Sequence, residues 1–183
     1  MRIIAGKHRG RQLFTPKDDK TIRPTSDFTR EALFNILQRR IVGAKVLDLF
    51  AGTGAISCES LSRGALSVVC CDRNGESISL IQKNLSMLGE KAEVLRLDWK
   101  DSCRRLQGRR FDVVYLDPPY AMVIDEVLAA IAEYDLLAEN GVAVYEHDSH
   151  DKGPEHAHFE VADERRYGRI GLTFYQRRTE KGE

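Results

Sequence analysis

A short polar segment that follows an apolar run near the middle of the chain is the first candidate for chemistry. Residues 111–115 read FDVVY and residues 116–120 read LDPPY. Neither proline can extend the hydrogen-bond ladder of a sheet, and Asp117 ends the apolar run with a charge, so the chain must leave the strand abruptly and stay rigid. Such a segment is poorly suited to a core and well suited to hold a site.

Glycines and acids also follow other apolar runs. Gly52 and Gly54 lie in LDLFAGTGAIS, where the backbone can approach a ligand without interference from side chains. Asp72 ends the next run, 18 residues after Gly54, where a carboxylate can accept hydrogen bonds from ribose hydroxyls. Asp98 ends a third run. A glycine pair after a strand is also a common tight connection, so the pair alone does not establish a ligand site.

The apolar patterns alternate between strand and helix periodicity, which predicts the elements that must position these residues. The expected strands are 45–50, 66–72, 92–98, 111–117 and 141–148, and the expected helices are 26–40, 54–64, 75–88, 99–106 and 122–134. Strands separated by helices indicate a parallel sheet with helices on both faces, and its ligands bind beyond the carboxyl ends of the strands. Residues 158–168 and 169–178 have no helix between them, which predicts an antiparallel pair.

The composition limits the class of protein. The 183 residues are 42% hydrophobic, which suits one domain with a sizeable core. The four cysteines show no CxxC spacing, and Cys70 and Cys71 are adjacent, so buried free thiols are favoured over disulfides or zinc. The histidines between 147 and 158 match no familiar metal site, and we predict no metal. Without an apolar leader or a run of about 18 apolar residues, the sequence predicts a cytoplasmic protein that does not enter a membrane.

The formal net charge is zero, but the charges are segregated. Residues 1–45 hold eleven Lys and Arg against four Asp and Glu, whereas the remainder holds 17 against 24. Lys and Arg gain affinity for polyanions by releasing counterions from phosphates, so a basic N-terminal segment beside an acidic body suggests an arm that faces a nucleic acid. A solvated segment with a chance bias is the alternative. The stretch RIIAGKHRGRQL alternates basic residues with Gly and aliphatics, which is compatible with a short strand or hairpin.

The glycine turn departs from the dinucleotide-binding fingerprint. G-x-G-x-x-G would place a third glycine at position 57, where this chain has Ser57, and Asp48 lies inside the strand before the turn. DLFAGTGAIS instead resembles motif I of the S-adenosylmethionine-dependent methyltransferases. A site rich in acids suits a sulfonium and an ammonium better than a pyrophosphate. The resemblance implies a Rossmann-like class I methyltransferase fold with seven strands and these cofactor-binding residues: Asp48, Phe50, Ala51, Gly52, Gly54, Asp72 and Asp98.

The segment DPPY resembles motif IV, [DNS]-PP-[YFW], of methyltransferases that modify exocyclic amines of nucleobases. The lone pair of such an amine is delocalised into the ring, which makes the amine a poor nucleophile. The resemblance implies that Asp117 accepts one amine N–H and the Pro118 carbonyl the other, which favours a pyramidal nitrogen. Tyr120 would stack on a base that is unpaired or flipped. The alternative is that the segment only ends a strand and packs an aromatic ring.

Five segments together resemble the bacterial 16S ribosomal RNA guanine-2-amino methyltransferase family, the RsmD type, over nearly the whole chain. They are MRIIAGKHRGRQL, RPTSDFTREALFNIL, VLDLFAGTGAISCESLSRGA, LDPPY and RRYGRIGLTFYQR, of which the N-terminal pair is the most specific. The resemblance implies methylation of the 2-amino group of one guanine by S-adenosylmethionine, with 16S rRNA or a small-subunit assembly intermediate as partner. It places Arg23, Thr25 and Asp27 over the cofactor pocket. It assigns RNA binding to Arg2, Lys7, Arg9, Arg11 and Arg23. Phe28 replaces a residue that is usually polar or basic, which weakens the case for RNA contacts from this helix.

We expect residues 1–25 to form a basic extension of a methyltransferase domain at 26–183, and the protein to act as a monomer. An amino methyltransferase acting on DNA, another base or protein glutamine would share both motifs, although 183 residues leave no room for a separate target-recognition domain. A noncatalytic rRNA assembly factor would keep a pocket without turnover, which the intact AGTG and DPPY segments disfavour. The sequence gives no role to Glu146, and Trp99 is suited equally to contact adenine or to close the core.

Overall fold

Helices and strands alternate along the chain in the expected order. The computed structural model describes residues 1–17 and 26–179, so Arg23 and Thr25 lie outside the described residues. The helices are α1 (Asp27–Ile41), α2 (Ala55–Ser62), α3 (Gly75–Leu88), α4 (Trp99–Arg105) and α5 (Ile124–Glu133). The strands are β1 (Lys45–Asp48), β2 (Ser67–Cys71), β3 (Glu93–Leu95), β4 (Phe111–Leu116), β5 (Leu137–Asp148), β6 (Phe159–Tyr167) and β7 (Ile170–Arg177).

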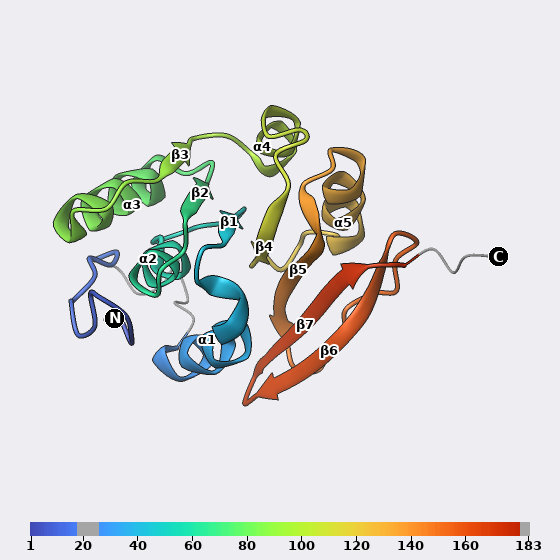
Figure 1. Ribbon diagram of the computed structural model, residues 1–183, viewed down its shortest axis with the longest axis horizontal. Helices are drawn as coiled ribbons and strands as arrows, with labels where there is room; N and C mark the ends of the chain where they lie inside the picture. The colour runs from blue at the N-terminus through green and yellow to red at the C-terminus, as the bar shows by residue number, and fades with distance from the viewer. Residues whose placement is uncertain (18–25, 180–183) are drawn as a thin grey trace.

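The seven strands form one sheet in the order β3-β2-β1-β4-β5-β7-β6 (Figure 1). The strands β1 to β5 pair in parallel, and β7 pairs antiparallel with both β5 and β6. This confirms the predicted parallel sheet with an antiparallel C-terminal pair. Strand β1 lies beside both β2 and β4, so the chain reverses its direction of travel across the sheet at β1. Ligands of parallel α/β sheets bind at the carboxyl ends of the strands beside such a switch point.

Helices cover both faces of the sheet (Figure 1). One core cluster joins α1, α2 and α3 to the strands through residues such as Leu33, Ile56 and Ile81. The other joins α4 and α5 to the opposite face through residues such as Cys103 and Leu128. Alternate residues of the parallel strands enter alternate clusters, because successive side chains of a strand point to opposite faces. Two buried faces explain why the central strands read as continuous apolar runs.

Most predicted boundaries lie within two residues of the observed ones, and two differ by three residues or more for physical reasons. Strand β3 ends at Leu95, not at Asp98, which is instead the N-cap of α4 and accepts a hydrogen bond of 3.0 Å from the Asp101 N–H. A carboxylate before a helix satisfies one of the unpaired N–H groups of the first turn. Strand β5 begins at Leu137, earlier than expected, because Leu137 pairs with Phe111 before the register shifts along β4.

The four cysteines are buried free thiols, as the sequence predicted. Burial raises the pKa of the Cys58, Cys71 and Cys103 thiols to about 12, so these groups stay neutral at physiological pH. Among the described residues, none of the helices has the length and apolar character needed to cross a membrane.

Candidate active site

The parallel strands bring carboxylates together at one edge of the sheet. Asp48 is the last residue of β1, and Asp72 directly follows β2. Asp117 directly follows β4, and Glu146 lies near the carboxyl end of β5. We call this edge, with these four acids, the acidic rim. Glycine and proline turns leave the strands at the same edge, so the rim combines charge with exposed backbone groups.

The glycine turn after β1 is fastened to the neighbouring strand. The Ala51 N–H donates to the Cys71 carbonyl at 2.9 Å, and the Gly52 N–H donates to Asp72 Oδ2 at 2.9 Å. Gly52 has a φ of +54°, and a Cβ at this position would meet no atom within 4 Å. The turn therefore presents backbone to open space, with a conformation that glycine adopts readily.

Asp72 holds the turn and keeps capacity to bind more donors. Its Oδ2 accepts from Gly52, and its Oδ1 accepts from the Asn74 N–H at 2.8 Å. Each carboxylate oxygen carries two lone pairs, so both oxygens can accept a second hydrogen bond. The side chain is partly exposed. Its position suits two hydroxyls of a ribose.

Asp48 is a buried acid behind the glycine turn. It is 1% exposed, and its Oδ2 accepts a hydrogen bond of 2.7 Å from the Ser57 hydroxyl at the start of α2. Its Oδ1 is buried and has no hydrogen-bond partner among the described residues. Burial and, to a lesser extent, the nearby Asp72 charge raise the pKa of Asp48 to about 7, against the lowering effect of the Ser57 bond. An unsatisfied buried oxygen of this kind is a strong acceptor for a donor or a cation.

The DPPY segment leaves two acceptors and an aromatic ring at the rim. Neither the Asp117 carboxylate nor the Pro118 carbonyl accepts a hydrogen bond from the residues that the structure describes. Tyr120 is 82% exposed, and the chain turns after Pro119, whose carbonyl accepts from the Met122 N–H at 2.9 Å. Burial, and then the charges of Glu146 and Asp48, raise the pKa of Asp117.

Several other residues that the sequence suggested for the cofactor site make contacts within the protein. Asp98 caps α4, and Phe50 and Trp99 pack beside the core cluster of α4 and α5. Asp27 forms an ion pair of 2.9 Å with Arg30. Sequence reasoning missed the contact in which the buried Tyr115 hydroxyl donates to Glu146 Oε2. The only sequence signal for it was the position of Glu146 in the row of strand ends.

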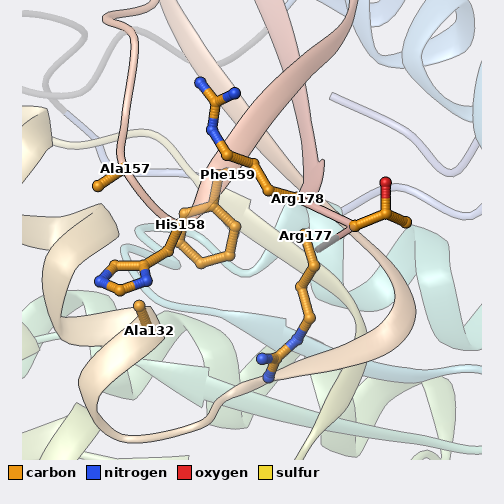
Figure 2. A pocket seen from close by; sticks show the side chains of 7 residues that line it. Ala132, Ala157, His158, Phe159, Arg177 and Arg178 are labelled. Atoms are coloured by element: carbon orange, nitrogen blue, oxygen red, sulfur yellow. The ribbon is translucent and has the colours of Figure 1, made fainter. Parts of the chain in front are cut away.

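A cavity of about 460 Å³ lies away from the acidic rim (Figure 2). It is lined by Ala132, Ala157, His158, Phe159, Arg177, Arg178 and Thr179. Arg177 ends β7 and donates to the carbonyl of Leu137, which begins β5, so the cavity lies at the opposite edge of the sheet. Arg177 also pairs with Asp135. Its guanidinium is engaged in holding the start of β5, and the cavity offers none of the acceptors of the rim.

The N-terminal segment folds as a small hairpin beside α2 and α3 (Figure 1). Arg2 and Gln12 form an antiparallel bridge, and the Gly10 N–H donates to the Ile3 carbonyl at 2.8 Å. The Lys7 N–H donates to the carbonyl of Ser62, the last residue of α2. Ser62 is eight residues beyond Gly54, so the tip of the hairpin lies on the order of 12 Å along α2 from the glycine turn.

The cations that were assigned to RNA have different surroundings. Lys7 pairs with Glu90 at 2.5 Å, and the Arg11 guanidinium donates to the Met87 carbonyl at 3.1 Å. Arg2 and Arg9 are exposed, and their side chains make no hydrogen bond or ion pair within the part of the chain that the structure describes. Arg2 and Arg9 therefore offer exposed charges that no described residue neutralises.

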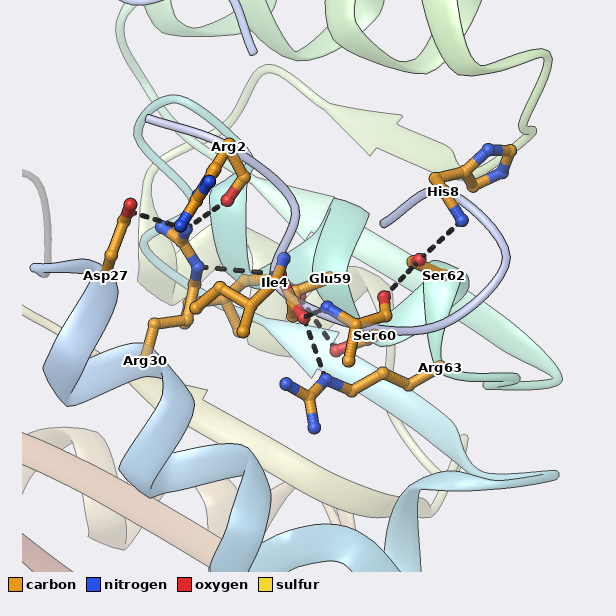
Figure 3. A network of polar contacts seen from close by, with 11 residues as sticks. Arg2, Ile4, His8, Asp27, Arg30, Glu59, Ser60, Ser62 and Arg63 are labelled. Carbon is orange, nitrogen blue, oxygen red and sulfur yellow. Dashed lines mark hydrogen bonds and ion pairs between the residues drawn. The ribbon is translucent and has the colours of Figure 1, made fainter. Parts of the chain in front are cut away.

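A buried ion network fixes the hairpin to the domain (Figure 3). Glu59 of α2 is fully buried and accepts hydrogen bonds from the N–H groups of Ile4 at 2.9 Å and Ala5 at 3.0 Å. Arg63 donates to Glu59 Oε1 at 2.8 Å, and the Nε of the buried Arg30 lies 3.6 Å from Oε2. The Arg30 guanidinium also donates to the Arg2 carbonyl. One carboxylate therefore joins α1, α2 and the hairpin.

A mostly parallel seven-stranded sheet, with a glycine turn after β1 and DPPY after β4, defines the Rossmann-like class I methyltransferase fold.

The model of the family described as Conserved hypothetical protein 95 matches residues 1–176. Ribosomal RNA small subunit methyltransferase D of Escherichia coli K12 is 33% identical over 97% of this chain and 90% of its own length. The Haemophilus influenzae protein of the same name is 35% identical over 80% of this chain and 78% of its own. A solved structure of a hypothetical protein from Thermus thermophilus has a TM-score of 0.84 at 29% identity, covering 96% of this chain and 99% of that chain. The chain belongs to this family of ribosomal RNA small subunit methyltransferase D proteins, which confirms the resemblance.

The Asp48→Asn substitution should make the stability of the protein less dependent on pH. The pKa of Asp48 is raised from 3.8 to about 7 in the folded state, so the folded state binds a proton that the unfolded state has lost between these values. The contribution of Asp48 to stability is therefore present below about pH 4 and is lost as the pH rises to about 7. Asparagine can still accept from Ser57 but carries no charge. At pH 8 the free energy of unfolding of the variant should therefore exceed that of the wild-type protein, by an amount on the order of 1 to 4 kcal/mol. Urea unfolding at pH 5 and pH 8 measures both effects, and an equal pH slope in the two proteins would contradict the assignment.

The Glu59→Ala substitution should destabilise the protein by about 3 to 5 kcal/mol, because it leaves the buried Arg30 uncompensated and two N–H groups without an acceptor. Glu93→Ala is the matched control. Glu93 forms an exposed pair with Arg109 at 2.7 Å, so its loss should cost about 1 kcal/mol or less. Chemical denaturation measures both values, and similar losses in the two variants would show that the Glu59 network does not hold the fold.

Proposed function

We propose that this protein transfers a methyl group from S-adenosylmethionine to the 2-amino group of a guanine in 16S ribosomal RNA. The observation that carries the proposal is the pair of acceptors at the acidic rim, the Asp117 carboxylate and the Pro118 carbonyl, which accept nothing from the described residues and stand beside the exposed Tyr120 ring. Two acceptors match the two N–H bonds of an exocyclic amine. The names of the family's curated relatives support ribosomal RNA as the substrate.

The residues around the glycine turn fit the cofactor. Gly52 leaves space where a side chain would stand, Asp72 has lone pairs for ribose hydroxyls, and Asp48 has a buried oxygen without a partner among the described residues. When bound, S-adenosylmethionine supplies a methyl group that is already activated by its sulfonium. The Asp72 charge raises the pKa of Asp48, so these two carboxylates repel one another. A positively charged ligand at the acidic rim would relieve this repulsion. Thr25, Phe50, Ala51, Gly54 and Asp98 are proposed as further cofactor contacts.

Asp117 and Pro118 would prepare the amine for attack. By accepting one N–H each, they would turn the nitrogen lone pair out of conjugation with the ring and toward the methyl carbon. Most of the acceleration then comes from alignment of the reacting atoms. The nitrogen becomes acidic once it is alkylated, and the raised pKa of Asp117 makes its carboxylate a suitable acceptor for the released proton. Tyr120 is 82% exposed and would stack on a base that has left its helix.

The substrate extends beyond one base, and the N-terminal hairpin is the proposed contact. The hairpin lies on a flank of the domain (Figure 1). Its cations Arg2, Lys7, Arg9 and Arg11, with Arg23 assigned to the same role, could bind the phosphates of an RNA that passes beside the rim. The hairpin is too small to read a long sequence, so the shape of the RNA, or of a small-subunit assembly intermediate, would contribute. We further propose that residues 1–25 and 26–183 act together as one cytoplasmic monomer.

The Gly52→Ala substitution should weaken cofactor binding more than it weakens the fold. Alanine in a left-handed conformation costs about 1 to 2 kcal/mol, and its Cβ would occupy space beside the turn that is open in the protein. Gly108→Ala is the matched control, because Gly108 also has a positive φ and open space but lies at the end of α4. Calorimetry with S-adenosylmethionine should show a loss of about tenfold or more for Gly52→Ala alone. Equal affinities in the two variants would contradict the proposed site.

The Asp117→Ala substitution should leave cofactor affinity nearly unchanged and lower methyl transfer by about 100-fold to 10,000-fold, since it removes an acceptor from the target amine. The assay uses small subunits from cells that lack this gene, with mass mapping of the methylated nucleoside. Asp163→Ala, on the outer strand β6, serves as the control and should keep full activity. Full activity in Asp117→Ala would refute the role of Asp117, and failure of the wild-type protein to methylate any guanine would refute the function.

A further inference from the structure

The acceptors assigned so far do not explain why guanine would be chosen. Adenine also carries an exocyclic amine, and Asp117 with the Pro118 carbonyl could hold either amine. The two bases differ at the neighbouring ring nitrogen, since N1 of guanine bears a hydrogen and donates, whereas N1 of adenine is an acceptor. Selection of guanine therefore needs a further acceptor beside Asp117, placed to meet N1–H along the Watson–Crick edge.

Glu146 stands where such an acceptor is needed. The β4–β5 register pairs Leu116 with Tyr145, so the next residues along the chain, Asp117 and Glu146, lie at the same level, where β4 has ended and β5 continues. On the other side, Glu146 pairs with Leu172 of β7, which holds its backbone in the sheet. The carboxylates of neighbouring strands at one level are within reach of a single base edge.

Tyr115 fixes the direction of the Glu146 side chain. Tyr115 is 2% exposed, packs in the core cluster of α1, α2 and α3, and donates its hydroxyl hydrogen bond to Glu146 Oε2. Tyr115 and Asp117 are two residues apart, so their side chains leave the chain on the same face. The Glu146 carboxylate is thus drawn to the face of the sheet that Asp117 shares.

We propose that Glu146 is the residue that selects guanine, by accepting N1–H while Asp117 accepts a hydrogen of the 2-amino group, and that Tyr115 is its positioning residue. The inference rests on the proposed function. A carboxylate has about four lone-pair sites on two oxygens, so the bond from Tyr115 is compatible with a bond from the base. Glu146 thereby gains a role in substrate choice that is separate from methyl transfer itself.

Electrostatics strengthens the discrimination. Asp117 and Glu146 are like charges at neighbouring positions, and the Glu146 charge contributes to raising the pKa of Asp117. The adjacent N–H donors of guanine would relieve this repulsion. Adenine would direct the lone pair of its N1 at a carboxylate, which adds repulsion in place of a hydrogen bond. A site built to bind a donor commonly rejects an analogue that lacks it by several orders of magnitude.

The test compares two target bases in two proteins. Small subunits are reconstituted with 16S rRNA that carries either guanine or 2-aminopurine at the methylated position; 2-aminopurine keeps the 2-amino group but has no N1–H. Wild-type protein should prefer guanine in kcat/KM by about 100-fold or more. Glu146→Gln can donate its amide hydrogen to N1 of 2-aminopurine, so its preference should fall to about tenfold or less. The intrinsic difference in reactivity between the two amines cancels when the two preference ratios are compared.

The controls separate failure of this inference from failure of the proposed function. Glu160→Gln, an exposed carboxylate on β6, should keep the wild-type ratio. Calorimetry with S-adenosylmethionine verifies that Glu146→Gln is folded, and Tyr115→Phe provides a second variant that should lower the ratio by loosening Glu146. If the wild-type protein methylates guanine and both variants keep its ratio, the role of Glu146 is wrong and the function stands. If the wild-type protein does not methylate guanine, the proposed function fails first.

Discussion

The repulsion between carboxylates gathered at one edge of the sheet is the constraint on which the site depends. Parallel pairing of β1, β2, β4 and β5 forces their carboxyl ends together, and each of these ends carries an acid. Burial and mutual charge raise the pKa of Asp48 and Asp117. An edge of this kind is unfavourable for the protein alone and favourable for a cation or for a base edge rich in N–H donors. The selectivity of the site thus follows from an arrangement that disfavours the protein without its ligands.

Individual hydrogen bonds to the carboxylates of the acidic rim partly offset their mutual repulsion. Ser57 donates to Asp48, the backbone of Gly52 and Asn74 donates to Asp72, and Tyr115 donates to Glu146. Each bond orients a carboxylate and leaves lone pairs for a ligand. Asp117 is the acid that accepts no such bond from the described residues, and it is also the one proposed to touch the reacting amine. Hydrogen bonds within the protein thus orient the surrounding acids, whereas Asp117 is proposed to bind the substrate.

The segregation of charge in the sequence has two explanations in the structure. Some cations of the N-terminal region form ion pairs within the chain, since Arg30 is buried against Glu59 and the exposed Lys7 pairs with Glu90. Others, such as Arg9, are exposed on the hairpin. The basic bias was therefore an incomplete guide to RNA contacts. A count of charges does not distinguish a cation that neutralises a buried acid from one that faces solvent.

Much of the fold and of the site could be predicted from the sequence by itself. Periodicity placed α3 at the observed residues, and the strand ends carried the glycine turn, Asp72 and DPPY to one edge, because local pattern fixes the type of an element and the face that each side chain takes. Only the tertiary structure decided that Tyr115 meets Glu146, 31 residues away, and that Glu59 receives the N–H groups of Ile4 and Ala5, 55 and 54 residues away. The strand end predicted at Asp98 was wrong for a related reason, since a carboxylate can end a strand or cap a helix with the same sequence signature. Strand order and register select which neighbours share a face, and no local pattern contains that information.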